Sequence, residues 1–251
     1  MENNLKDVQL GRRGKTTYDW LPSNLDRLLD VGCSYGYFTK FYLSKCKKVY
    51  GIDPDNKMIE VGKSRCPQVE FKVARAEDLP FEEDYFDAVV LNDVFEHVDS
   101  ERKSLDEIKR VLKKEGIVIL TVPNKGLFRF LDVDNHSWRV RTYFPRLYNI
   151  FNKLRGKEIK VREGYFKKHR HYSIKEIKDL FENNFEITRF TRRGLFLGVF
   201  ISNIELVTRL LFGEKACVKI RNILLPIRNF DYGINYGRWS RQLIVCARKL
   251  I

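Results

Sequence analysis

The feature that most constrains the fold is a regular alternation, in the first half of the chain, between short β-rich runs and segments that suit a helix. The β-rich runs cover residues 27–31, 48–53, 69–74, 86–92 and 116–122. The helix-compatible segments between them cover residues 37–45, 55–64 and 100–113. Consecutive apolar residues, as at 88–91, are typical of strands that are buried on both faces. The alternation therefore predicts βαβ units and an α/β fold, with a mostly parallel sheet covered by helices on both faces.

Charge and regularity both change near residue 123. The chain has 251 residues, with 47 Lys and Arg against 33 Asp and Glu. Residues 1–125 carry 21 basic and 22 acidic side chains, whereas residues 126–251 carry 26 and 11, a net charge of +15. Residues 123–172 are rich in Arg, Lys, Phe and Tyr, and they are too long for a bare loop in a compact domain. We expect a single domain over residues 1–251 with an inserted helical cap at 123–172.

Regular structure is expected to resume at residue 173. Ser173 and Glu176 have the spacing of a helix capping box. A strand is expected at 185–191, and the last strand near 242–247.

An apolar stretch, residues 194–225, lies between these two strands. Ser202, Glu205 and Arg209 fall on one helix face there, which predicts an amphipathic segment with a broad apolar face. Charged side chains are costly at the centre of a bilayer, so we do not expect this segment to span a membrane. Packing on the sheet, on a lipid surface or on a second copy of the chain are three alternatives that the pattern leaves open.

The residues that indicate a ligand follow the first β-rich run. There the predicted strand at 27–31, which contains Asp30, ends, a turn contains Gly32 and Gly36, and a helix is expected to begin. Glycine permits a positive φ and close approach of a ligand, and a helix N-terminus offers free N–H groups. Asp53 ends the next strand, 23 residues after Asp30, where a carboxylate can accept hydrogen bonds from both ribose hydroxyls. The pattern predicts a nucleoside site at the carboxyl ends of the strands.

The type of nucleoside follows from what surrounds the turn. With only Gly32 and Gly36 the G-x-G-x-x-G dinucleotide fingerprint is incomplete, and the chain contains no P-loop sequence. The Asp30 carboxylate suits a cationic ligand end, an ammonium or a sulfonium, better than a phosphate. This combination points to S-adenosylmethionine.

Four segments, in order, resemble class I S-adenosylmethionine-dependent methyltransferases. They are DVGCSYGYF at 30–38, GIDPD at 51–55, ARAEDLPFEEDYFDAVVLNDVFEHV at 74–98 and VLKKEGIVILTVPN at 111–124. The resemblance is closest to the small-molecule branch that includes ubiquinone/menaquinone and sugar or lipid methyltransferases. It implies a Rossmann-like sheet of seven strands, parallel except for the last, and methyl transfer from S-adenosylmethionine.

The same resemblance implies a set of cofactor-binding residues: Asp30, Gly32, Cys33, Gly36, Asp53, Pro54, Ala76, Glu77 and Asn92. The motif turn would line the methionine end, and Asp53 would hold the ribose. The Ala76 backbone, together with Glu77, would contact the adenine, and the Asn92 backbone would border the cofactor.

The chain departs from the family pattern at two positions. Arg75 replaces an Asp that grips the adenine amino group in many relatives, and Ser34 stands where many have Gly. We expect the serine to be tolerated because it adds only a hydroxyl.

Two histidines are candidate catalytic residues. The resemblance places His97 near the methyl donor, and His171 follows a basic run at 167–170. A general base is needed only if the acceptor is a weak acid such as a hydroxyl. Residues 18–20 could also fold over the cofactor. The five cysteines are far apart and odd in number, which predicts no metal site and a reduced, cytoplasmic setting, and no signal peptide is visible.

The acceptor is expected to be anionic, because the acceptor pocket would be formed by the basic 123–172 insertion and the C-terminal region. A small molecule, a glycan or a lipid precursor fits best, with peripheral contact at the inner face of a membrane as an option. Two alternatives compete with this interpretation. The late basic cluster is compatible with RNA methylation, although no amino-methylating N/D-P-P-[YF] motif is present. Arg75 supports a non-catalytic protein that binds S-adenosylmethionine.

Overall fold

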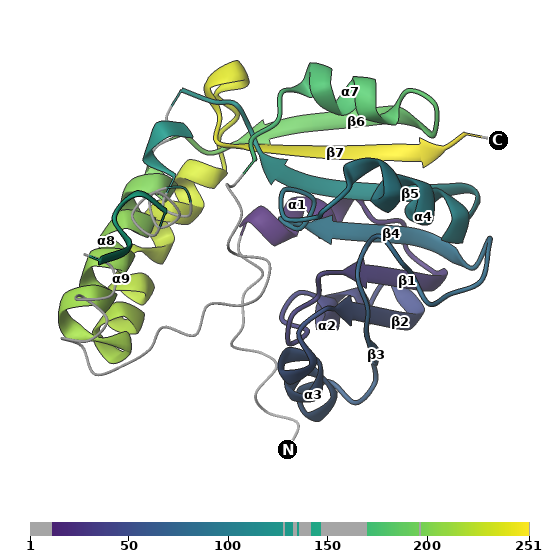
Figure 1. Cartoon of the computed structure of the whole chain (residues 1–251), viewed down its shortest axis with the longest axis horizontal. Helices are drawn as coiled ribbons and strands as arrows, with labels where there is room; N and C mark the ends of the chain where they lie inside the picture. The colour runs from purple at the N-terminus through teal and green to yellow at the C-terminus, as the bar shows by residue number, and fades with distance from the viewer. Residues whose placement is uncertain are drawn as a thin grey trace. The chain divides into compact units, whose positions relative to one another are not determined.

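The computed structural model describes residues 12–127, 129–132, 135, 142–146, 170–195 and 197–250. The chain divides into two compact units (Figure 1). The first, here called the sheet unit, comprises Met1–Val122, Ser173–Thr191 and Leu243–Ile251. The second, here called the hairpin unit, comprises Pro123–Tyr172 and Arg192–Gln242.

A seven-stranded sheet in the order β3-β2-β1-β4-β5-β7-β6 forms the core of the fold. Its strands are β1 (Leu25–Val31), β2 (Cys46–Asp53), β3 (Glu70–Val73), β4 (Phe86–Asn92), β5 (Leu112–Pro123), β6 (Phe185–Arg193) and β7 (Gln242–Lys249). The pairs β1–β2, β1–β4, β2–β3 and β4–β5 are parallel. The β7 arrow runs opposite to those of β5 and β6 in Figure 1. The predicted mostly parallel seven-stranded sheet is confirmed.

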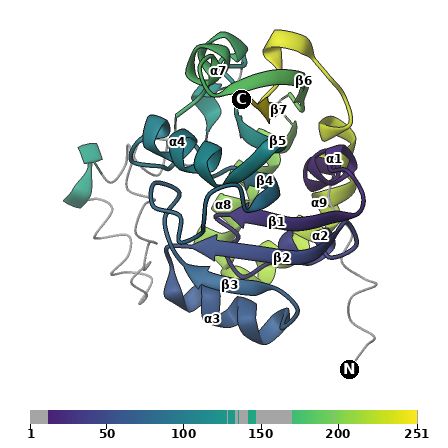
Figure 2. The same cartoon turned by 90° about the vertical axis from the view of Figure 1, so that its right-hand side faces the viewer.

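Helices cover both faces of the sheet, as predicted. Their bounds in the sheet unit are α1 (Arg12–Trp20), α2 (Thr39–Tyr42), α3 (Asn56–Arg65), α4 (Glu101–Val111) and α7 (Ile174–Phe181). Figure 2 shows α4 and α7 on one side of the strands and α1 and α2 on the other.

Side-chain caps explain where three of these helices begin. Asp55 accepts the Lys57 N–H at the start of α3, and Ser100 accepts the Lys103 N–H at the start of α4. The capping box of Ser173 and Glu176 is present at α7. The helix expected at 37–45 is shorter, only four residues flanked by turns, and Phe38 at its start offers no side-chain oxygen as a cap.

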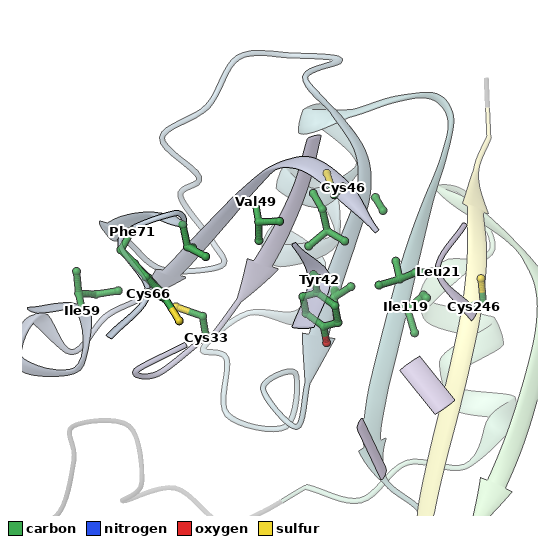
Figure 3. Packing of buried hydrophobic residues seen from close by; sticks show 14 of the residues in the cluster. Leu21, Cys33, Tyr42, Cys46, Val49, Ile59, Cys66, Phe71, Ile119 and Cys246 are labelled. Carbon is green, nitrogen blue, oxygen red and sulfur yellow. The ribbon is translucent and has the colours of Figure 1, made fainter. Parts of the chain in front are cut away.

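An apolar cluster between the sheet and its helices fixes the strand ends in place. Figure 3 shows Phe71, Ile59, Cys66 and Cys33 grouped at one end of this cluster, with Tyr42 nearer its middle. The Phe71 ring packs against glycines: an added Cβ would lie 2.7 Å from it at position 36, 2.9 Å at position 51 and 3.1 Å at position 62. The Phe71 ring therefore packs directly against the turn that follows β1, at Gly36.

The apolar stretch at 194–225 belongs to two helices in the hairpin unit, α8 (Leu197–Phe212) and α9 (Glu214–Tyr232). Gly213, with φ of +84°, is the single residue between them. No helix among the described residues is long and apolar enough to cross a membrane. The helical cap predicted at 123–172 lies mostly outside the described residues. The part that is described there includes a 3-10 helix at Arg129–Leu131.

Candidate functional site

The turn after β1 depends on left-handed backbone conformations. Gly32 has φ of +71° and Gly36 has φ of +77°. A Cβ on Gly32 would overlap the Val94 side chain, so this position needs glycine for space as well as for conformation. Ser34 is also left-handed, with φ of +53°. The serine therefore adds a backbone cost of about 1 kcal/mol that the expectation from its hydroxyl alone did not include.

Asp53 holds this turn against the end of β2. Its Oδ2 accepts the Ser34 N–H at 2.9 Å, and its Oδ1 accepts the Asp55 N–H at 2.9 Å. The Cys33 N–H donates to the Ile52 carbonyl at 2.9 Å. Each carboxylate oxygen keeps a further lone pair, and this remaining capacity suits the two hydroxyls of a ribose. Pro54 lies between the two acidic residues in the same connection.

Asp30 is buried at the end of β1. Burial raises the pKa of its carboxyl to about 7, which the 2.6 Å hydrogen bond from the Thr39 hydroxyl opposes and the charge of Asp53 reinforces. A buried carboxylate of this kind is stabilised by a nearby cation. The ammonium or sulfonium end of S-adenosylmethionine supplies such a cation, so the residues present fit this cofactor.

The side chain of Asn92, at the end of β4, is occupied by two helices. Its Oδ1 accepts the Thr17 hydroxyl of α1 at 3.0 Å, and its Nδ2 donates to the Tyr42 hydroxyl at 2.8 Å. These two hydrogen bonds fix the orientation of the amide, and contact of the Asn92 backbone with a cofactor stays a prediction. Sequence reasoning missed Thr17, Thr39 and Tyr42, since no local motif marks them.

The region expected to contact adenine is organised around Asp99. The Arg75 guanidinium pairs with the Asp99 carboxylate at 2.7 Å. The Glu77 carboxylate accepts the N–H groups of Asp99 and Ser100, just before α4. Ala76 between them is buried. In this arrangement Glu77 positions the loop before α4, and adenine contact through Ala76 and Glu77 stays a prediction.

The two candidate catalytic histidines belong to different units. His97 is half-buried in a turn after β4, and its N–H donates to the Val94 carbonyl at 2.8 Å. His171, in the hairpin unit, is mostly buried, and its Nε2 lies 3.1 Å from the Asp132 carboxylate. Sequence reasoning missed Asp132, which lies 39 residues before the histidine it orients.

A metal centre or a disulfide could also contribute to a site of this kind. Within the described ranges, no group of three or more His, Cys, Asp and Glu side chains could hold a metal ion. All five cysteines lie in the described part of the chain, and each is buried without a disulfide.

Comparison with known proteins supplies the family. Residues 29–120, which run from β1 to β5, match a family model described as a methyltransferase domain. These residues are a class I S-adenosylmethionine-dependent methyltransferase domain. The match starts one residue before Asp30 and includes every cofactor-binding residue predicted from the sequence.

Among curated relatives of this methyltransferase is a demethylmenaquinone methyltransferase of Thermotoga maritima, 27% identical over 194 residues, 71% of this chain and 80% of that protein. A demethylmenaquinone methyltransferase of Clavibacter sepedonicus is 36% identical over 111 residues, 43% of this chain and 45% of that one. Against the latter the chain spans less than half of the relative's length. The resemblance to ubiquinone/menaquinone methyltransferases is confirmed by these relatives.

A solved structure shares the fold over nearly the whole methyltransferase. Geranyl diphosphate C-methyltransferase from Streptomyces coelicolor A3(2), in complex with Mg²⁺, geranyl diphosphate and S-adenosyl-L-homocysteine, matches with a TM-score of 0.59 at 16% identity. The match covers 95% of this chain and 77% of that one. At this identity the likeness concerns the fold alone.

Proposed function

We propose that this chain transfers the methyl group of S-adenosylmethionine to an anionic small-molecule, glycan or lipid-precursor acceptor. The observation that carries the proposal is the segregation of charge between the two units. The hairpin unit has 22 basic and 7 acidic residues, a net charge of +15, while the sheet unit with the cofactor turn has a net charge of −1. Basic surroundings concentrate and hold anionic ligands. The relatives named for demethylmenaquinone support a small-molecule acceptor.

The cofactor side of the proposal uses residues whose chemistry is explicit. S-adenosylmethionine, when bound, supplies a methyl group on a positively charged sulfur that leaves as a neutral thioether. Asp30 would face the cationic end and Asp53 the ribose, while Gly32 and Gly36 let the backbone approach. The chain's own contribution is then to align the acceptor and exclude water.

Proton removal, where the acceptor needs it, is the proposed role of a histidine. His171 is the better-prepared candidate, because its imidazole is mostly buried and the Asp132 carboxylate, 3.1 Å from Nε2, orients the ring. His97 is the second candidate, from the sheet unit. For a carbanion-like or carboxylate acceptor neither would be required.

The proposal also places the enzyme in the cytoplasm, in peripheral contact with the inner face of a membrane. Five buried thiols without a disulfide support a reducing compartment.

The first test is calorimetric titration with S-adenosylmethionine and with S-adenosylhomocysteine. We expect saturable binding of both, and Asp53→Ala should weaken it about 100-fold because two ribose hydrogen bonds are lost. Asp26→Ala is the matched control, since this exposed carboxylate pairs with Lys47 where β1 and β2 begin, at the opposite strand ends from the cofactor turn. Unchanged affinity in the Asp53 variant would contradict the assigned site.

Turnover decides between an enzyme and a binding protein. Purified protein is incubated with radiolabelled S-adenosylmethionine and pools of anionic lipid precursors, glycans and carboxylated or phosphorylated small molecules. We expect label in one of these pools. Tight cofactor binding with no labelled acceptor in any of them would favour the non-catalytic alternative.

RNA methylation is the second candidate function, and the +15 charge of the hairpin unit favours it. It predicts RNA binding that weakens steeply with salt, together with label transferred to RNA. Label in a small-molecule pool and none in RNA would eliminate it.

A further inference from the structure

The α8–α9 hairpin has a buried carboxylate between its two helices. Glu205 of α8 is buried, and its carboxylate accepts from Arg228 at 3.2 Å and from Arg221 at 3.4 Å, both on α9. Arg221 and Arg209 also reach the Sγ of Cys217, which is fully buried, at 3.8 and 3.7 Å. In an ordinary amphipathic hairpin the seam between the helices is apolar. Here the seam is ionic.

The apolar side chains lie outside instead. Six of them are between 46% and 69% exposed: Phe200, Val207 and Leu211 on α8, and Ile223, Ile227 and Phe230 on α9. Their spacing is helical, at i, i+7 and i+11 on α8 and at i, i+4 and i+7 on α9, so each set forms one stripe. Scattered exposed apolar residues are ordinary, but two continuous stripes on one hairpin are not.

The two helices run antiparallel side by side (Figure 1). Two contacts pair positions on either side of Gly213: the Arg209 guanidinium donates to the Cys217 sulfur, and Glu205 forms an ion pair with Arg221. At the open end Asp231, near the end of α9, accepts the N–H groups of Leu195 and Gly198 at the start of α8. The hairpin is therefore closed at both ends.

Helix geometry places both stripes on the same side of the hairpin. With about 100° per residue, the stripe on each helix lies about 135° before the face turned toward the other helix. That face is marked by Glu205 on α8 and by Cys217 and Arg221 on α9. Reversing the direction of one helix reverses its sense of rotation as seen from one end. Equal offsets in two antiparallel helices therefore point the same way. The six residues form one surface, here called the apolar face, while Val218 and Asn222 of α9 fall on the opposite side.

The positive charge around the apolar face favours an anionic lipid surface over a second copy of the chain. Residues 192–241 hold nine basic and three acidic residues, a net charge of +6, and Lys215 and Lys219 on α9 are exposed. Exposed Trp239 stacks with Arg238, whose guanidinium lies 5.8 Å from the ring, in the same unit. A second copy would bring the same +15 unit against itself. Anionic headgroups neutralise these cations while acyl chains accept the Phe, Leu and Ile side chains.

We infer that the α8–α9 hairpin docks flat on an anionic phospholipid surface, with the apolar face inserted among the acyl chains. The ion pairs to Glu205 keep the polar groups satisfied within the hairpin, so insertion needs no rearrangement of the helices. Over their described residues, neither helix is long and apolar enough to cross a bilayer. The docking does not depend on methyl transfer, so it is measured with no cofactor present.

The test is co-sedimentation of the full chain with vesicles of phosphatidylcholine alone and of phosphatidylcholine with phosphatidylglycerol in equal parts. We expect binding to the mixed vesicles only. The double variant Ile223→Asn/Phe230→Asn should bind at least about tenfold more weakly. Val218→Asn, which makes the same kind of change on the opposite side of α9, should bind like the parent. Circular dichroism and cofactor titration of each variant confirm that it is folded and keep a failure here distinct from a failure of the proposed function.

Three results would overturn the inference. One is absence of binding to both kinds of vesicle by the folded parent. Another is equal binding of the parent and the double variant, since the basic residues alone would then account for attachment. The third is a concentration-dependent dimer in sedimentation velocity that the double variant abolishes. The apolar face would then be a dimer interface and not a lipid-binding surface.

Discussion

The two units of this methyltransferase place their polar and apolar residues in opposite ways. In the sheet unit the strands bury consecutive apolar residues and gather carboxylates at their ends, where Asp30 and Asp53 fix the cofactor turn. In the hairpin unit the carboxylate of Glu205 is buried between helices while phenylalanine and isoleucine are exposed. The difference teaches that the sheet unit satisfies its apolar residues within its own core, whereas the hairpin unit leaves apolar side chains exposed on its surface.

The largest expected effect compares two left-handed glycines, one in each unit. Gly32→Ala should lower the free energy of unfolding by about 3 kcal/mol, because the new Cβ overlaps Val94 in addition to straining φ. Gly237→Ala, in the hairpin unit, strains a φ of +61° with open space around it, so about 1 kcal/mol is expected. Urea denaturation measures both. Equal losses would mean that crowding beneath the cofactor turn contributes nothing.

The buried charge of the hairpin unit gives the next effect. Glu205→Ala leaves Arg221 and Arg228 facing each other without a carboxylate, at an expected cost of about 2 kcal/mol, reduced from a fully buried pair because the arginines are partly exposed. The matched loss of an exposed ion pair, Asp19→Ala in the sheet unit, should cost less than about 0.5 kcal/mol. Thermal unfolding of the two variants compares them. Similar small shifts would show that the ionic seam does not hold the hairpin together.

Much of the sheet unit could be predicted because its determinants are local. Apolar runs at 86–92 and 116–122 predict β4 and β5. The turn from Asp30 to Gly36 lies within seven consecutive residues. The partners that tune the site come from distant elements: Thr17 reaches Asn92 across 75 positions, and no pattern marks it.

The hairpin unit escaped prediction for a different reason. The pattern correctly grouped Glu205 and Arg209 on one helix face, but periodicity cannot say whether a polar face points outward or inward. Sequence rules assume outward, and here the face packs against α9. The break at Gly213 was likewise overlooked within a continuous apolar stretch, although glycine followed by a helix-starting acidic residue was its available sign.

The carboxylate chemistry of the sheet unit predicts a pH dependence of cofactor binding. The pKa of Asp30 is about 7, and its ionised form attracts the cationic end of S-adenosylmethionine. Affinity should therefore rise with pH and be about tenfold higher at pH 8 than at pH 6. Titration calorimetry at both pH values measures this, and Asp30→Asn should remove the dependence. A slope that persists in the variant would assign it to another group.

The same titration has an opposite consequence for stability without cofactor. The folded chain holds the Asp30 proton more tightly than the unfolded chain, whose ordinary value is 3.8. The contribution of this group to stability is therefore full below pH 4 and is lost as pH rises toward 7. Cofactor binding reverses that loss.

The smallest effect concerns Ser34, a left-handed residue where many relatives have glycine. Ser34→Gly removes the cost of φ at +53° and should raise the free energy of unfolding by up to about 1 kcal/mol, partly offset by the greater freedom of glycine in the unfolded chain. The Ser34 N–H that donates to Asp53 is unchanged by the substitution, so cofactor affinity should stay within twofold. Urea denaturation and calorimetry on the same samples separate the two quantities. A stable variant with weakened binding would instead make the serine hydroxyl part of the cofactor site, and the sheet unit would then depend on a side chain that its family pattern lacks.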